Sequence, residues 1–222
     1  MQVLLDGQLV AGDFPSLASA ISAAVNTAGP HRIIIEASAD GTPLTDEQLM
    51  APPTTPGGFS IVRFTSANPK DLVRVTLLDA VDVLNGVRPE QAEVADLIQR
   101  GETQNALTLL QSVLNKWQAI RDVADRSSQV LGVDLAAVQL RQTTTGATFT
   151  SATTDLSRHM LEVKNALKAQ DWSLLSDVIG YDLDQQAANW AELFSNFADA
   201  VPSLDSTLHA PGPATHQKAG PA

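Results

Sequence analysis

A histidine and two carboxylates share one predicted helix in the C-terminal half of the chain. Asp155, His159 and Glu162 are spaced four and three residues apart, which places them on one helical face. Imidazole and carboxylate groups are ligands of divalent ions. A metal-dependent module centred on these three residues is therefore one hypothesis. We prefer a solvated polar face, because such pairs also stabilise helices without an ion, and we predict no metal.

A second group of carboxylates surrounds the single tyrosine. Asp177, Asp182 and Asp184 lie close to Tyr181 in the sequence. Two carboxylates act as general acid and base when burial separates their pKa values. Nothing in the sequence indicates such burial, and these residues suit the solvated side of an amphipathic helix. We therefore expect the acidic rim of a binding surface here and no catalytic residue.

The sequence lacks the motifs of the common enzyme and cofactor classes. It has no cysteine, which excludes disulfides, thiolate catalysis and zinc sites with cysteine ligands. Asp40-Gly41 and Gly57-Gly58 are not part of a P-loop or a dinucleotide fingerprint. No serine stands in a nucleophile elbow, and no segment has the EF-hand pattern. We predict a non-enzymatic protein without a cofactor.

Aromatic residues on predicted helices are the candidates for binding a partner. Aromatic side chains in an apolar stripe usually face the core. One that is partly exposed would instead anchor a partner protein. The six candidates are Trp117, Trp172, Tyr181, Trp190, Phe194 and Phe197.

The helices that position these residues follow from the period of apolar residues after Asn68. Asn68 and Pro69 suit the N-cap and first position of a helix. A threonine-rich segment, 142–154, predicts a loop, and the Pro- and Gly-rich residues 203–222 predict a disordered tail. The predicted helices run from Asn68 to Leu84, from Pro89 to Arg100, from Gly101 to about Leu131, from about Ser151 to Leu167, and from Asp171 to Val201 with a bend at Gly180.

The first 67 residues predict a small unit with strands. Asp6-Gly7 is a hairpin turn between two short apolar runs. A helix, a β-branched strand at 32–37, a helical turn after Thr45 and a strand at 59–65 follow. This order is that of a β-grasp, or ubiquitin-like, unit. The predicted fold is α+β, with a β-grasp-like unit (1–67) before an antiparallel helical bundle (68–202).

Charge limits the partners of the protein. Asp and Glu number 25 against 14 Lys and Arg, and the net charge is −11. A nucleic-acid backbone or an anionic membrane would be repelled. The N-terminus lacks the basic and apolar regions of a signal peptide, and no stretch approaches about 20 apolar residues. We expect a cytoplasmic protein that binds neither nucleic acid nor membrane.

Three segments resemble a family of uncharacterised bacterial proteins. They are the turn Asp40-Gly41-Thr42-Pro43-Leu44, the segment Phe64 to Pro69 that leads into a helix, and the stretch Leu167 to Trp190. The resemblance covers most of residues 1–201. It implies a β-grasp-like unit before a helical region, and it brings no catalytic residues and no established activity.

A looser likeness is to the flagellar export chaperones, small antiparallel helical bundles that hold a secreted subunit. The segments Leu72 to Leu84 and Gln99 to Trp117 are similar to their helix-and-turn arrangement. The chain departs from them by its N-terminal β unit and its long last helix.

These observations predict an adaptor or chaperone-like protein that binds another protein through apolar grooves between helices, in bacterial motility or secretion. The alternative is a self-assembling structural protein, in which the last helix pairs between subunits to form a homodimer. An enzyme or metal-dependent module centred on Asp155, His159 and Glu162 is the third hypothesis.

Overall fold

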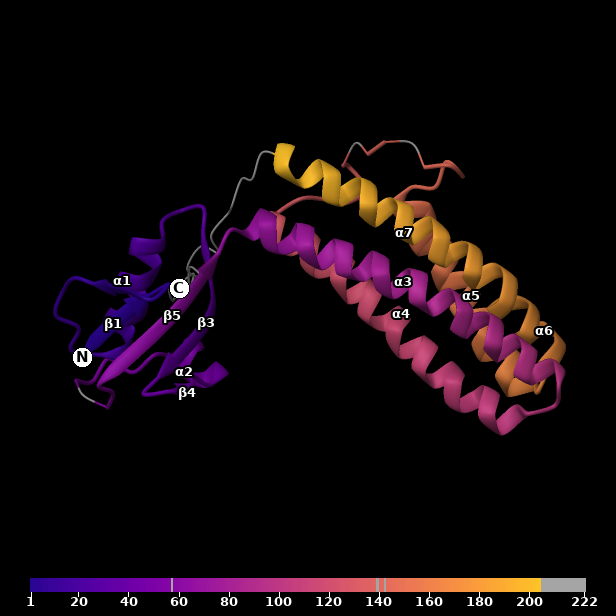
Figure 1. Ribbon diagram of the computed structural model, residues 1–222, viewed down its shortest axis with the longest axis horizontal. Coiled ribbons are helices and arrows are strands. Elements are labelled where there is room, and N and C mark those ends of the chain that lie inside the picture. The colour runs from indigo at the N-terminus through magenta and orange to yellow at the C-terminus, as the bar shows by residue number, and fades with distance from the viewer. Residues whose placement is uncertain (57, 139, 142, 205–222) are drawn as a thin grey trace, which may run out of the picture.

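The computed structural model describes residues 1–56, 58–138, 140–141 and 143–204. It is an α+β protein, in which a five-stranded mixed sheet precedes a helical region (Figure 1). The predicted fold class is confirmed. Of the predicted tail, residues 205–222 lie outside the described residues, and Val201–Ser203 form a short 3₁₀-helix.

The N-terminal unit has the sheet order of a β-grasp. The order is β2-β1-β5-β3-β4, with β1 and β5 parallel at the centre and the other neighbours antiparallel. Helix α1 (Leu17–Ala28) packs on one face of the sheet, and α2 (Asp46–Met50) is a single short helix. The strands are β1 (Gln2–Leu5), β2 (Gln8–Val10), β3 (Ile33–Ala39), β4 (Thr42–Pro43) and β5 (Ile61–Ala67).

Two aspartates in turns join the hairpins of this unit to β5. Asp6 and Asp40 have positive φ angles of 50° and 48°. Asp6 accepts hydrogen bonds from the backbone N and the Oγ of Ser66, both at 2.7 Å. Asp40 accepts from the backbone N of Ser60 at 3.0 Å and of Ile61 at 2.8 Å. Each turn is therefore fixed by its own carboxylate.

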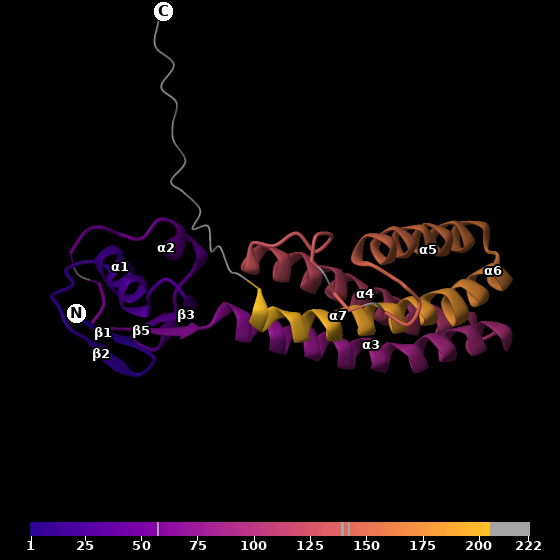
Figure 2. The same cartoon turned by 90° about the horizontal axis from the view of Figure 1, so that it is seen from above.

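The helical region is an antiparallel bundle built on α3. Helix α3 packs against both α4 and α7, whereas α5 packs against α6 and α7 (Figures 1 and 2). No helix among the described residues is long and apolar enough to cross a membrane. The helices are α3 (Pro69–Gln99), α4 (Thr103–Leu131), α5 (Phe149–Ala169), α6 (Trp172–Asp177) and α7 (Leu183–Ala200).

The break predicted between Leu84 and Pro89 is wrong, because α3 continues through both Gly86 and Pro89. Proline removes one hydrogen bond from a helix interior. The buried residues nevertheless keep their helical period through Leu84, Val87 and Gln91. Contacts with two neighbouring helices outweigh this local cost, so tertiary packing decides the outcome here.

The last helix is continuous, as predicted, but has an irregular turn. At the predicted bend, Val178–Asp182 form a π-helical segment between α6 and α7. Gly180 allows the close approach of this segment to α3, since an added Cβ would lie 3.1 Å from the Cβ of Ala95. The π-turn therefore lies at a tight contact between two helices.

The loop predicted over 142–154 is wrong in its second half, because α5 begins at Phe149. Thr148 is its N-cap and forms a capping box with Ser151. Threonine favours caps as well as loops. The threonines that follow occupy the first turns of α5, and Thr154 Oγ1 donates to the carbonyl of Thr150 at 2.9 Å.

The two units are joined without an intervening loop. Strand β5 ends at Ala67, Asn68 caps the next helix by accepting from the backbone N of Lys70 at 2.9 Å, and α3 begins at Pro69. The hydrophobic core of the sheet and that of the bundle share no residue. Each unit is therefore stabilised by a core of its own.

Candidate functional site

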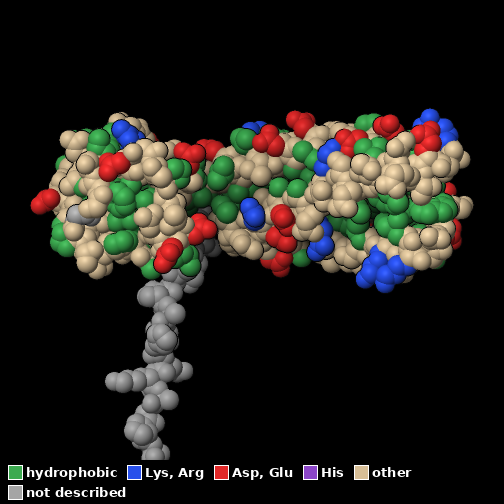
Figure 3. All heavy atoms as spheres, turned by 90° about the horizontal axis from the view of Figure 1, so that it is seen from below, with side chains coloured by type: hydrophobic (Ala, Val, Ile, Leu, Met, Phe, Trp, Pro, Cys, Tyr) green, Lys and Arg blue, Asp and Glu red, His purple; other side chains and the backbone are tan. Residues whose placement is uncertain are grey.

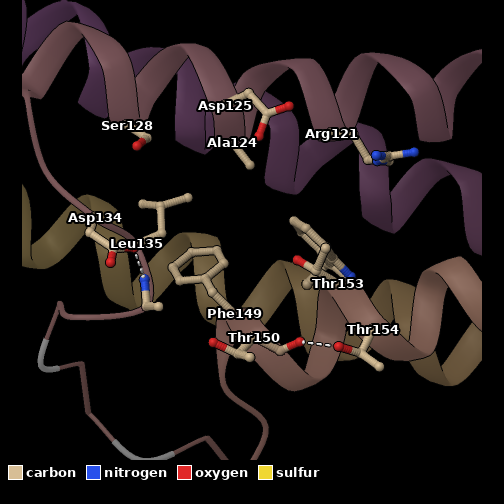
Figure 4. Close-up of a pocket in the computed structure, with 12 residues that line it drawn as sticks. Arg121, Ala124, Asp125, Ser128, Asp134, Leu135, Phe149, Thr150, Thr153 and Thr154 are labelled. Carbon is tan, nitrogen blue, oxygen red and sulfur yellow. Dashed lines mark hydrogen bonds between the residues drawn. The ribbon is translucent and has the colours of Figure 1, made fainter.

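A groove lies between α4 and the N-terminal half of α5. These helices pack on α3 and α7 and make no extensive contact with each other. The resulting pocket has a volume of about 370 Å³ (Figure 4). It is lined by Arg121, Ala124, Asp125 and Ser128 of α4, by Asp134, Leu135 and Ala136 of the next loop, by Phe149, Thr150, Thr153 and Thr154 of α5, and by Trp190 of α7.

The floor of this groove is aromatic. The rings of Phe149 and Trp190 lie edge to face, with centroids 6.1 Å apart. Phe149 also contacts Phe194 and Phe197, at 6.0 and 5.8 Å between centroids. Because these rings belong to the bundle core, the floor is rigid. Apolar floors of this kind accept apolar groups of a ligand.

The indole of Trp190, which lines this floor, carries a buried polar atom. This side chain is 2% exposed, and its Nε1 has no hydrogen-bond partner within the described part of the chain. A buried N–H without an acceptor is costly. Because Nε1 is closed to solvent, the indole offers the pocket its apolar atoms.

The rim of the groove is polar. Figure 4 shows Arg121 and Asp125 on α4 facing Thr150 and Thr154 on α5, across the entrance. Ser128 donates to the carbonyl of Val133 at 2.6 Å, and this bond fixes the loop that follows α4. These polar residues surround the aromatic floor.

One family model matches the chain. It covers residues 75–193, more than half of the chain, and its description is Domain of unknown function (DUF8042). The chain belongs to this family. The DUF8042 match begins within α3 and ends within α7, so that it includes every residue that lines the groove. Neither the curated proteins nor the solved structures contain a match.

The structure places the six aromatic candidates in different environments. Trp117, Trp190, Phe194 and Phe197 are at most 2% exposed, because their stripes face the bundle core. They offer a partner no surface, apart from the part of Trp190 at the groove floor. Trp172 is half-buried, and Tyr181 is 74% exposed. Phe194 and Phe197 lie beyond the DUF8042 match.

The histidine cluster differs from the expected one in one member. His159 and Glu162 lie together, but the third member of the cluster is Asp182 of the π-helical segment. Asp155 instead pairs with Arg158 at 3.4 Å. The expected rim of three aspartates around Tyr181 is divided, since Asp182 faces His159 and Asp184 pairs with Arg88.

Sequence reasoning missed most of the groove. Arg121, Asp125 and Thr153 belong to no motif, and each is an ordinary polar residue on the exposed side of its helix. The groove exists because two helices in the DUF8042 region make no extensive contact with each other. No local pattern in the sequence carries that information.

Proposed function

We propose that the protein is a non-enzymatic, chaperone-like binding module that holds an apolar segment of a partner protein in the groove between α4 and α5. One observation carries the proposal: the rings of Phe149 and Trp190 form an aromatic floor under an open pocket of about 370 Å³ between the two helices. A polypeptide supplies the complement, a large apolar side chain on a backbone whose polar groups can pair with the polar rim.

The charge of the protein favours a basic segment. The chain carries a net charge of −11, and Asp125 and Asp134 stand on the rim of the groove. A field of this sign attracts lysine- and arginine-rich partners and repels nucleic acid. The preferred partner therefore combines an apolar side chain with neighbouring basic residues.

The proposed biological setting comes from the resemblances. Uncharacterised bacterial proteins share soft motifs with the chain, and the flagellar export chaperones share its helix-and-turn arrangement. We therefore place the protein in the bacterial cytoplasm, where it would hold a subunit destined for secretion or for a motility apparatus. The binding experiment below does not depend on this setting.

Site-specific photo-crosslinking tests the groove. A photoreactive residue is placed at Thr153 of α5, which is exposed on the rim of the groove. A second variant carries it at Thr108 of α4, which is exposed outside the groove. Crosslinking from Thr153 should give peptides that contain a large apolar residue near Lys or Arg, and Thr108 should not. Ala124→Phe fills the pocket and should abolish the signal while circular dichroism stays unchanged. Equal capture from both positions, or capture that survives Ala124→Phe, would disprove the proposal.

A second candidate function, self-assembly as a homodimer, is supported by the outer face of α3. Val75 is 55% exposed there, and three further apolar side chains of α3 are more than a third exposed: Leu72, Leu78 and Val83. Beside Leu72, a mainly apolar pocket of about 470 Å³ is bordered by Val123 and Val130. Figure 3 shows apolar side chains at this end of the helical region, next to the N-terminal unit.

The dimer hypothesis therefore moves from the last helix to α3, because the apolar face of α7 is used inside the bundle. Light scattering during size exclusion decides between the hypotheses. A dimer at all concentrations that Val75→Lys converts to a monomer would favour self-assembly. A monomer in both proteins would leave the groove as the functional surface.

A further inference from the structure

One histidine of the helical region lies buried between two carboxylates. His159 of α5 is 4% exposed. Its Nδ1 lies 3.1 Å from Oε2 of Glu162 and 3.7 Å from Oδ2 of Asp182. One ligand atom from each of the three residues lies within 4.8 Å of the others. We infer that His159, Glu162 and Asp182 bind a divalent transition-metal ion, independently of whether the groove binds a partner.

The distances suit a coordination sphere. Two ligand atoms that bind one ion at about 2.1 Å lie about 3.0 Å apart in octahedral and about 3.4 Å apart in tetrahedral geometry. The two separations from Nδ1, 3.1 and 3.7 Å, lie close to these values. Small side-chain rotations therefore bring all three groups onto one ion. Glu162 and Asp182 have side-chain exposures of 35% and 49%, so that the ion has access from solvent.

The π-helical segment brings the third ligand into place. Asp182 is its last residue, and the wider π-turn changes which side of the helix the following side chains occupy. Gly180 in the same turn is held close to Ala95 of α3. Single π-turns in helices are frequent at functional sites. The irregular turn and the ligand cluster therefore point to the same function.

Arg158 competes with the ion. Its Nη2 lies 3.1 Å from Nε2 of His159, and its Nη1 lies 3.2 Å from Oε1 of Glu162. Arginine only donates, so Nε2 accepts and the ring proton is on Nδ1, which donates to Glu162. An ion at Nδ1 moves this proton to Nε2, where it faces a donor. Arg158 must then swing away, and its side chain is 54% exposed.

The ligand set selects the class of ion. One imidazole and two carboxylates give a neutral site with a divalent ion, and they combine a borderline donor with hard ones. Zn²⁺, Co²⁺ and Mn²⁺ suit such a set, whereas Mg²⁺ and Ca²⁺ prefer oxygen ligands alone. The site therefore discriminates against Mg²⁺. Water molecules complete the coordination of the ion.

The test measures Zn²⁺ binding by calorimetry on the full chain after chelator treatment. His31, His209 and His216 are replaced by alanine throughout, so that His159 is the one remaining histidine. We expect one Zn²⁺ per chain, and at least about tenfold weaker binding in both Glu162→Gln and Asp182→Asn. Asp155→Asn on the same helix is the matched control, and its affinity should stay unchanged.

Two further measurements sharpen the result. Arg158→Gln should tighten binding, because it removes the competing donor. Zn²⁺ should shift the NMR resonances of both ring nitrogens of His159, because Nδ1 exchanges its proton for the ion and Nε2 gains that proton. The same spectra report on the fold of each variant. Absence of saturable binding would overturn the inference. Binding that is equal in Asp182→Asn and in the Asp155→Asn control would overturn it as well.

Discussion

Arg88 forms a bidentate ion pair with both carboxylate oxygens of Asp184. Its Nε donates to Oδ1 at 2.8 Å, and its Nη2 donates to Oδ2 at 2.9 Å. The pair joins α3, one residue before Pro89, to the first turn of α7. It therefore connects the two helices at the position where the hydrogen bonding of α3 is weakest.

Replacement of the guanidinium tests this connection. Arg88→Lys should lower the free energy of unfolding by about 0.5–1 kcal/mol, because an ammonium group cannot form two parallel bonds and the pair is partly solvated. Urea denaturation followed by tryptophan fluorescence measures the change. Arg100→Lys, whose partner Asp96 lies on the same helix and is well exposed, should have almost no effect. Equal losses in both variants would show that the geometry is unimportant.

The contact between Gly180 and Ala95 predicts a coupled pair. Gly180→Ala gains about 1 kcal/mol of helix propensity, but the new Cβ would lie 3.1 Å from that of Ala95. Overpacking of this kind costs about 1–3 kcal/mol, so a net loss near 1 kcal/mol is expected. In a double-mutant cycle, Ala95→Gly should relieve the overpacking in Gly180→Ala. A coupling energy of zero would mean that the helices separate freely.

Gln91 predicts a stabilising substitution. The side chain is fully buried, and neither its Oε1 nor its Nε2 has a hydrogen-bond partner in the described chain. Gln91→Met keeps the shape and removes the polar atoms, so stability should rise by about 1–2 kcal/mol. Gln99→Met is the control and should destabilise, because Nε2 of Gln99 donates to Oγ of Ser176 at 3.1 Å. A loss in Gln91→Met would contradict the prediction.

The N-terminal unit should lose stability in acid. Hydrogen bonds from Ser66 hold the pKa of Asp6 below its usual 3.8, and those from Ser60 and Ile61 do the same for Asp40. A depressed folded-state pKa stabilises the fold above the unfolded value of 3.8, and this stabilisation is lost as the pH falls through the folded-state pKa.

Amide NMR measures this acid unfolding, because all three tryptophans lie in the helical region and do not report on the sheet. The double variant Asp6→Asn and Asp40→Asn should have a lower free energy of unfolding at pH 7. This free energy should change less between pH 4 and 2 than that of the original protein. Asparagine tolerates the positive φ of both positions. Asp13→Asn, in an exposed segment, should retain the original pH dependence.

The regular parts of the fold could be predicted from the sequence. Long apolar stripes predicted α4 and the helix through Trp190, and the Asp6-Gly7 turn with its flanking runs predicted the first hairpin. The failures at Pro89 and Phe149 share a cause. The local preferences of proline and threonine predict breaks, whereas packing against two neighbouring helices and a capping box make both segments helical.

The candidate sites were less accessible to sequence reasoning. His159 and Glu162 were identified from their spacing on one helix. Asp182 is separated from them by a turn between helices and belongs to a π-turn, where the period of 3.6 residues fails. The groove depends on two helices that make no extensive contact with each other. Helical periodicity describes only the face of each helix that is buried.

Because β5 continues into α3 without a loop, a small rotation at their junction would displace the far end of the long helix. With 31 residues, α3 spans about 46 Å, so a rotation of about 10° at Asn68 would carry its far end through about 8 Å. A molecule that binds the sheet and one that binds the bundle would then influence each other's position mechanically, although the two cores share no side chain. Helix α3 therefore acts as a rigid connection between the two units.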